Sequence, residues 1–170
     1  NLAIAYVANG KWEKGWDEYE WGIGNPKLRE DRNLHGVPYW KGEPGTVLVY
    51  GEQGIGDEIM FASMLPDILK TNKVVFECHT RLQTLFQNSF PQIQVYGTRE
   101  DRETPSWVAK EKVDYRISIG SLGKFYRRSK EAFPGSPYLK AEPVEKTKLR
   151  VGIAWTGGVI KASRMRKRSV

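Results

Sequence analysis

Cysteine and histidine are scarce in this chain, which has one cysteine and two histidines in 170 residues. A single thiol excludes an internal disulfide, and the apolar run at residues 74–78 predicts that Cys78 is a buried strand residue. His35 and His79 are far apart and have no cysteine or acidic partner at ligand spacing, so we predict no metal site. The composition suits a reducing, cytoplasmic setting.

Long hydrophobic runs are also missing. No apolar stretch approaches the roughly 20 residues that a membrane span needs, and no signal peptide is visible. We therefore predict no membrane span. The content of 39% hydrophobic and 12% aromatic residues is enough for a core of one ordinary domain, or of a small domain with an appendage.

The formal net charge of +7 is unevenly distributed. Five basic residues fall within the last ten positions: Lys161, Arg164, Arg166, Lys167 and Arg168. Such a run fits a disordered tail or a loop that neutralises the diphosphate of an activated donor. Nucleic-acid binding is the weaker interpretation, because no recognised reading module accompanies the charge.

Residues 46–61, TVLVYGEQGIGDEIMF, are the most informative stretch. An apolar run at residues 47–49 predicts a strand buried on both faces, glycines 51, 54 and 56 predict a tight turn, and residues 59–69 predict a helix. A turn at the carboxyl end of a parallel strand is where open α/β sheets bind ligands.

The glycine spacing excludes two common nucleotide-binding loops. A dinucleotide fingerprint needs G-x-G-x-x-G, and a P-loop needs Gly-Lys-Ser/Thr where Gly56, Asp57 and Glu58 stand. A carboxylate at a helix N-terminus also repels phosphate. The loop therefore favours a polar, proton-accepting role for Asp57, and a simple helix cap is the alternative.

The pattern of strand and helix then repeats along the chain. We predict strands at residues 73–78, 93–96 and 115–119, helices at residues 81–87 and 106–112, and a long polar connection at residues 120–139. This alternation predicts an α/β fold with a Rossmann-like, mostly parallel sheet over residues 46–140.

Residues 1–23 have a different character, with small and aromatic residues at offsets that pack two short antiparallel helices around an Asn9-Gly10 turn. This segment resembles one tetratricopeptide repeat, which would belong to a longer array; the alternative is a helical hairpin that only packs on the α/β domain. Residues 24–45 predict an irregular connection, in which Tyr39 and Trp40 either stack on a sugar ring or pin the loop.

The last part of the chain changes composition twice. Residues 141–148 are charged and contain Pro143, which indicates an interdomain linker. Residues 149–170 begin with a strand and a glycine turn, which predicts the start of a second Rossmann-like unit. We therefore expect the chain to be a fragment of a longer protein.

Several motifs together resemble those of bacterial tetratricopeptide-repeat proteins whose carboxyl half is a GT-B glycosyltransferase similar to the heptosyltransferases. The shared elements are Trp40 and Gly42, the E-Q-G-x-G-D run from Glu52 to Asp57, Pro137-Tyr138-Leu139, Trp155-Thr156-Gly157-Gly158, and Arg168-Ser169. The resemblance covers nearly the whole chain.

The resemblance implies two Rossmann-like domains that face a cleft, and an inverting sugar transfer without a metal. Asp57 would be the base that deprotonates the acceptor hydroxyl, and Glu52, Gln53, Gly54 and Gly56 would bind the acceptor. A nucleotide sugar would be the donor substrate, with no further cofactor. The residues implied for donor binding are Thr156, Gly157, Gly158, Lys161, Arg168 and Ser169. Because the second domain does not follow, we expect these 170 residues to be inactive alone.

Two other classes of function stay open. The repeat helices would hold a protein partner if the chain is a binding module without catalysis. A nucleic-acid binder would use the basic end, and its affinity would fall steeply with salt.

Overall fold

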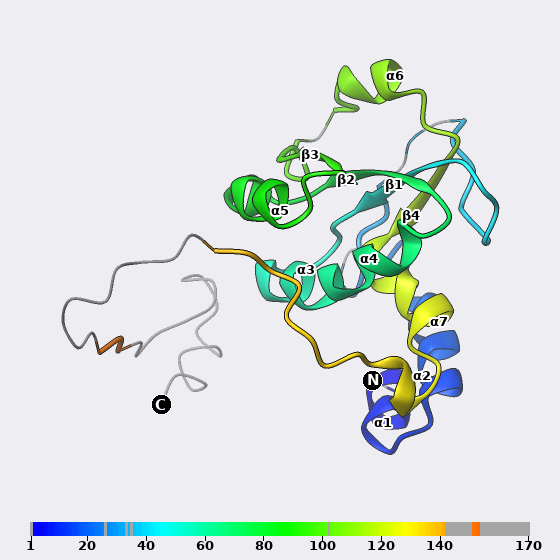
Figure 1. Cartoon of the computed structure of the whole chain (residues 1–170). Helices are drawn as coiled ribbons and strands as arrows, with labels where there is room; N and C mark the ends of the chain where they lie inside the picture. The colour runs from blue at the N-terminus through cyan, green and yellow to red at the C-terminus, as the bar shows by residue number, and fades with distance from the viewer. Residues whose placement is uncertain are drawn as a thin grey trace.

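A four-stranded parallel sheet forms the centre of the computed structural model, which describes residues 2–25, 27–32, 34, 36–101, 103–141 and 151–153 (Figure 1). The strands lie in the order β3-β2-β1-β4. Their bounds are β1 Thr46–Tyr50, β2 Lys73–Glu77, β3 Gln94–Tyr96 and β4 Tyr115–Ser118. Every pair is parallel, which confirms the predicted α/β class and sheet.

Both faces of the sheet are buried, as the continuous apolar run in β1 predicts. Val47 and Val49 point into the larger core cluster, and Leu48 between them points into the smaller one. The larger cluster is closed by α3 (Ile55–Phe61), α4 (Leu65–Ile68) and α5 (Gln83–Ser89). Helix α6 (Trp107–Glu111) lies on the opposite side of the sheet from α3 and α4 (Figure 1).

The strands and helices at residues 46–119 agree closely with the prediction, apart from an informative difference in the first helix of this range. Helix α3 begins at Ile55, four positions before the predicted start, because Gly54 serves as its N-cap. The predicted helix is also broken: a 3₁₀ turn, η2 (Ala62–Met64), separates α3 from α4. Pro66 lies in the first turn of α4, where its missing N–H costs no hydrogen bond. A second 3₁₀ turn, η3 (Thr80–Leu82), precedes α5.

Two short helices, α1 (Leu2–Ala8) and α2 (Trp12–Tyr19), form the amino-terminal hairpin. Gly10 turns the chain between them with a φ of +71°. The helices meet closely, since a Cβ placed on Gly15 would lie 2.5 Å from Val7 Cγ2. The turn η1 (Glu20–Gly22) follows α2 directly. The hairpin itself is therefore observed, and its assignment as a tetratricopeptide unit stays a proposal.

Residues 120–139 do not form the long polar connection that we predicted. They contain the end of η4 (Ile119–Leu122), then α7 (Gly123–Tyr126) and η5 (Lys130–Ala132). Helix α7 packs on α2, and Trp16 Nε1 donates a 2.6 Å hydrogen bond to the carbonyl oxygen of Arg127. No sequence pattern indicated this packing, because Gly123 is the only residue of α7 that is buried.

The α2–α7 contact gives a first prediction. Replacing Gly123 by alanine should lower the free energy of unfolding by about 1–3 kcal/mol, because the new Cβ would lie 2.5 Å from the rigid ring of the buried Trp16. Gly56→Ala is the matched control, since no atom beyond its chain neighbours and the backbone of its own helix lies within 4 Å of its Cβ position, and alanine favours helix. Urea unfolding should show loss in the first variant and a gain of about 0.5–1 kcal/mol in the second; equal effects would contradict this packing.

The described residues of the connection at 24–45 are irregular, as predicted, and form no helix or strand beyond isolated bridges such as that of Tyr39 with Arg116. Trp40 is 5% exposed, its ring centroid lies 4.7 Å from that of Phe125, and its Nε1 donates to the carbonyl oxygen of Glu43. The guanidinium carbon of Arg116 lies 4.0 Å from the centroid of the Tyr39 ring. These contacts pin the loop to the domain, and burial of the Trp40 ring leaves it unsuited to stacking on a sugar. His35 lies outside the described residues.

The second Rossmann-like unit predicted at residues 149–170 is described only at residues 151–153. Val151 and Ile153 are 74% and 76% exposed, and the three residues form no strand with the described part of the chain. The rest of that prediction, and most of the predicted linker at residues 141–148, lie outside the described residues. None of the helices that the structure describes is long and apolar enough to cross a membrane.

Candidate functional site

The loop after β1 places Asp57 in the first turn of α3, at the carboxyl edge of the parallel sheet. The backbone N–H of Gly54 donates a 3.0 Å hydrogen bond to Asp57 Oδ2. The capping role that we weighed for Asp57 is therefore present. It uses one carboxylate oxygen, and no described residue makes a hydrogen bond with the other.

Asp57 also lines a cavity of about 410 Å³ between the amino-terminal hairpin and α3. The walls are mostly apolar, with contributions from α1, α2, α3 and η2. The wall includes Ile4 from α1, Trp16 from α2, Met60 from α3 and Met64 from η2. The cavity thus combines one carboxylate with a mostly apolar surface.

Gln53 is the second predicted residue at this cavity. Its side-chain oxygen accepts a 2.6 Å hydrogen bond from the Tyr19 hydroxyl, and its amide nitrogen donates to the carbonyl oxygen of Leu28. Burial raises the pKa of Tyr19 well above its usual value, so the phenol stays a donor to Gln53. The hairpin therefore fixes the orientation of a side chain in the β1–α3 loop.

Glu52 lies beside this cavity and does not line it. Its side chain is fully buried, and its carboxylate is paired with the Arg29 guanidinium at 2.8 Å. Burial raises the pKa of Glu52, and Arg29 opposes that shift. Glu52 therefore forms a structural ion pair in this structure, and its predicted acceptor contact stays a prediction. Gly54 is the exposed N-cap of α3, and Gly56 is an exposed residue in its first turn.

Arg29 joins the hairpin, the connection and the sheet edge. Its side chain is 2% exposed, and besides Glu52 it donates to the Ser118 and Ser121 hydroxyls at 2.6 and 2.8 Å. It also donates to the Tyr19 carbonyl oxygen and the Glu20 carboxylate, and its guanidinium lies 4.0 Å from the centroid of the Tyr19 ring. Sequence reasoning missed Arg29, because a lone arginine in an irregular segment has no periodic signal.

Glu58, next to Asp57, connects the neighbouring loops, and sequence reasoning missed this residue as well. Its side chain is fully buried; Oε2 accepts a 2.9 Å hydrogen bond from the His79 N–H, and Oε1 lies 2.8 Å from Arg99 Nε. Arg99 in turn donates to the carbonyl oxygen of Gln53. Burial raises the pKa of Glu58 to about 7, against the opposing effects of His79 N–H and Arg99.

This shift predicts a dependence of stability on pH. The pKa of this carboxyl group is about 7 in the folded state and about 4.5 in the unfolded state. Between these pH values the folded state therefore binds more protons than the unfolded state. The contribution of Glu58 to stability is present below pH 4.5 and is lost as the pH rises to 7. Glu58→Gln should remove a slope of up to about 1.4 kcal/mol per pH unit in that window. Thermal unfolding of both proteins from pH 4.5 to 8 checks this, and parallel curves would contradict it.

A polar cavity of about 650 Å³ borders the same edge of the sheet. Two of its lining residues, Arg32 and Arg99, form ion pairs with the buried carboxylates of Glu77 and Glu58, respectively. Exposed acidic side chains, such as Asp101, complete its wall. These mixed charges come from two separate segments, residues 30–32 and 99–101, so no single sequence motif predicted them.

No group of three or more potential metal ligands occurs among the residues that the structure describes. Cys78 is fully buried, and burial raises the pKa of its thiol to about 12, which fits the predicted structural role. The six residues implied for donor binding lie outside the described residues: Thr156, Gly157, Gly158, Lys161, Arg168 and Ser169.

Comparison with known proteins gives one similarity. The chain is 30% identical over 193 aligned residues to Protein FlbA of Caulobacter vibrioides. The alignment covers 97% of this chain and 32% of FlbA, so the chain spans about a third of the length of that relative. No family model matches the chain, and no solved structure matches it.

Proposed function

We propose that the chain is the acceptor-side half of a GT-B glycosyltransferase, with Asp57 as the base that deprotonates the acceptor hydroxyl. The observation that carries the proposal is the position of Asp57 at the rim of a cavity, on a loop that follows a central parallel strand. Ligands of open α/β sheets bind at this edge. The E-Q-G-x-G-D motif and its resemblance to heptosyltransferase-like enzymes give the reaction class.

The geometry of Asp57 suits a general base. The Gly54 N–H holds Oδ2, which orients the carboxylate while Oδ1 is available to a hydroxyl group. The apolar cavity wall would carry the non-reacting part of the acceptor. Gln53, fixed by Tyr19, would border the acceptor on its polar side.

In the proposed reaction the acceptor oxygen attacks the anomeric carbon of the donor from the side opposite the diphosphate. The new carbon–oxygen bond forms as the bond to the diphosphate breaks, and the hydroxyl proton passes to Asp57. The leaving diphosphate needs donors and positive charge. Thr156, Gly157, Gly158, Lys161, Arg168 and Ser169 would supply them, and the reaction uses no metal.

A binding assay tests the proposed donor. A panel of nucleotide sugars and nucleoside diphosphates is titrated against this chain and against the full-length gene product, with thermal unfolding as the readout. We expect stabilisation of the full-length protein by one donor class and no effect on the 170 residues alone. Absence of stabilisation in both proteins would argue against glycosyl transfer.

A protein-binding module without catalysis is the second candidate. Helix α1 favours it, because its Leu2 and Ile4 are 55% and 62% exposed. In that case the hairpin would bind a partner and Asp57 would serve only as a cap, so affinity for the partner would survive Asp57→Asn. Capture of a partner with the same affinity by both proteins, without any donor binding, would favour this function.

A further inference from the structure

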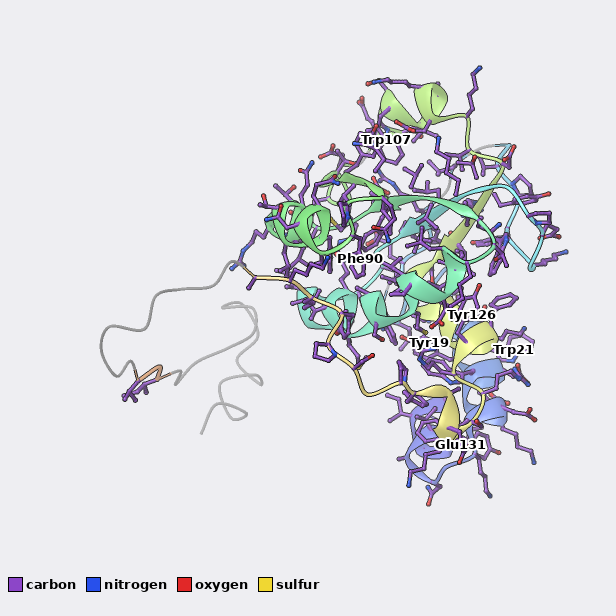
Figure 2. All side chains as sticks on the ribbon, in the orientation of Figure 1. Tyr19, Trp21, Phe90, Trp107, Tyr126 and Glu131 are labelled. Carbon is purple, nitrogen blue, oxygen red and sulfur yellow. The ribbon has the colours of Figure 1, made fainter. Side chains whose placement is uncertain are left out.

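Trp21 is 84% exposed, more than any other large hydrophobic residue in the described part of the chain. It lies in η1, directly after α2. Figure 2 shows Tyr19 within the molecule and Trp21 at its edge, although the two residues are only two positions apart. An exposed indole ring leaves a large apolar surface in water, and aromatic side chains in such positions commonly mark binding sites.

The ring borders a second cavity, of about 420 Å³. This cavity lies next to the one that Asp57 lines, and Tyr19 and Gln53 belong to both. A ligand in the second cavity therefore lies beside the same side-chain amide that borders the proposed acceptor site.

The walls of the second cavity are both apolar and polar. Trp21, Leu2 and Leu28 supply exposed apolar surface. Glu18 and Lys27 supply an acceptor and a donor, and neither their carboxylate nor their ammonium group forms a hydrogen bond or ion pair with a described residue. An apolar side chain placed here would leave both charged groups without partners, which is unfavourable.

We propose that this cavity binds a saccharide, with one sugar ring stacked on Trp21 and its hydroxyl groups bonded to Glu18 and Lys27. A sugar ring has an apolar C–H face and a rim of hydroxyl groups that both donate and accept, which matches these two kinds of wall. As an assignment of the acceptor class, the inference rests on the proposed function. The acceptor would then be a glycan whose reactive hydroxyl group lies past Gln53, at Asp57.

The test is a binding measurement that needs no turnover. Neutral monosaccharides and their trisaccharides, including those of glucose, galactose and N-acetylglucosamine, are titrated against the 170-residue chain and the full-length gene product. Tryptophan fluorescence and saturation-transfer NMR report binding. We expect at least one sugar to bind, and Trp21→Ala to weaken it by about tenfold or more, or about 1.4 kcal/mol. Trp21→Phe should retain part of the affinity, because it keeps an aromatic ring.

Ile153→Ala is the control, because Ile153 is 76% exposed and lines neither of these two cavities. It should bind the sugar as the wild type does. No binding to the wild type, or equal binding by Trp21→Ala, would overturn the proposal. Self-association that is lost in Trp21→Ala, without sugar binding, would assign the ring to a protein contact instead.

The outcome is separable from that of the proposed function. Sugar binding without any donor binding would keep the saccharide site and remove the glycosyltransferase assignment. Donor binding and turnover without a Trp21-dependent sugar site would keep the glycosyltransferase assignment and remove the saccharide site.

Discussion

Replacing Arg29 by methionine is expected to lower the free energy of unfolding by about 3–5 kcal/mol. The substitution keeps an unbranched side chain but leaves the carboxylate of Glu52, which is fully buried, without its cation. It also removes the donors to Ser118 and Ser121 and the link to the hairpin through Tyr19. In a chain of this size we expect a fall in melting temperature on the order of 10 °C.

Arg128→Met is the matched control. Arg128 also forms ion pairs, with Glu13 and Asp17 at 3.6 and 3.3 Å, but its side chain is 38% exposed. Exposed pairs contribute about 0–1 kcal/mol, so this variant should unfold nearly as the wild type does. The double variant Arg29→Met with Glu52→Gln should recover part of the loss, because no buried charge then lacks a partner. Equal stability of Arg29→Met and Arg128→Met in urea would contradict the role given to Arg29.

Replacing Asp57 by asparagine is expected to lower the turnover of the full-length gene product by about 10²–10⁴-fold, the usual contribution of a general base. Asparagine has nearly the same shape, and its side-chain oxygen can still accept the hydrogen bond from the Gly54 N–H. Donor affinity and thermal stability should therefore stay close to those of the wild type. The measurement is the initial rate of nucleoside diphosphate release at saturating donor.

Asp57→Ala separates the two roles of the residue. It removes both the base and the cap, so it should lose turnover and also about 1 kcal/mol of stability. If Asp57→Asn keeps full turnover while Asp57→Ala loses only stability, Asp57 is a cap alone.

The core of the fold could be predicted from the sequence because its signals are local. The apolar run around Val47 predicted a strand buried on both faces, the run around Val75 predicted a second strand, and the glycine turn after Tyr50 predicted a loop at the carboxyl edge of the sheet. Strand and helix alternation then predicted parallel pairing. The predicted role of Asp57 as a helix cap was equally local, since the carboxylate and the Gly54 N–H that donates to it are three residues apart.

The buried ion pairs could not be predicted, because their partners are distant in the sequence. Arg29 and Glu52 are 23 residues apart, and the Glu58 carboxylate meets Arg99 from another loop. The short helix α7 was missed for a related reason: its stability comes from packing of Gly123 against Trp16 and not from its own apolar periodicity. Such contacts are decided by the tertiary structure, and a single sequence carries no pairing information for them.

The most direct test of the central claim compares wild type and Asp57→Asn in one assay of the full-length gene product. Nucleotide sugars that stabilise the protein are supplied at saturation, with the sugars that bind at Trp21 as acceptors, and release of nucleoside diphosphate is followed with time. The account predicts acceptor-dependent release by the wild type and a loss of at least about 10²-fold in Asp57→Asn, with unchanged donor affinity. Equal release by the two proteins would contradict it.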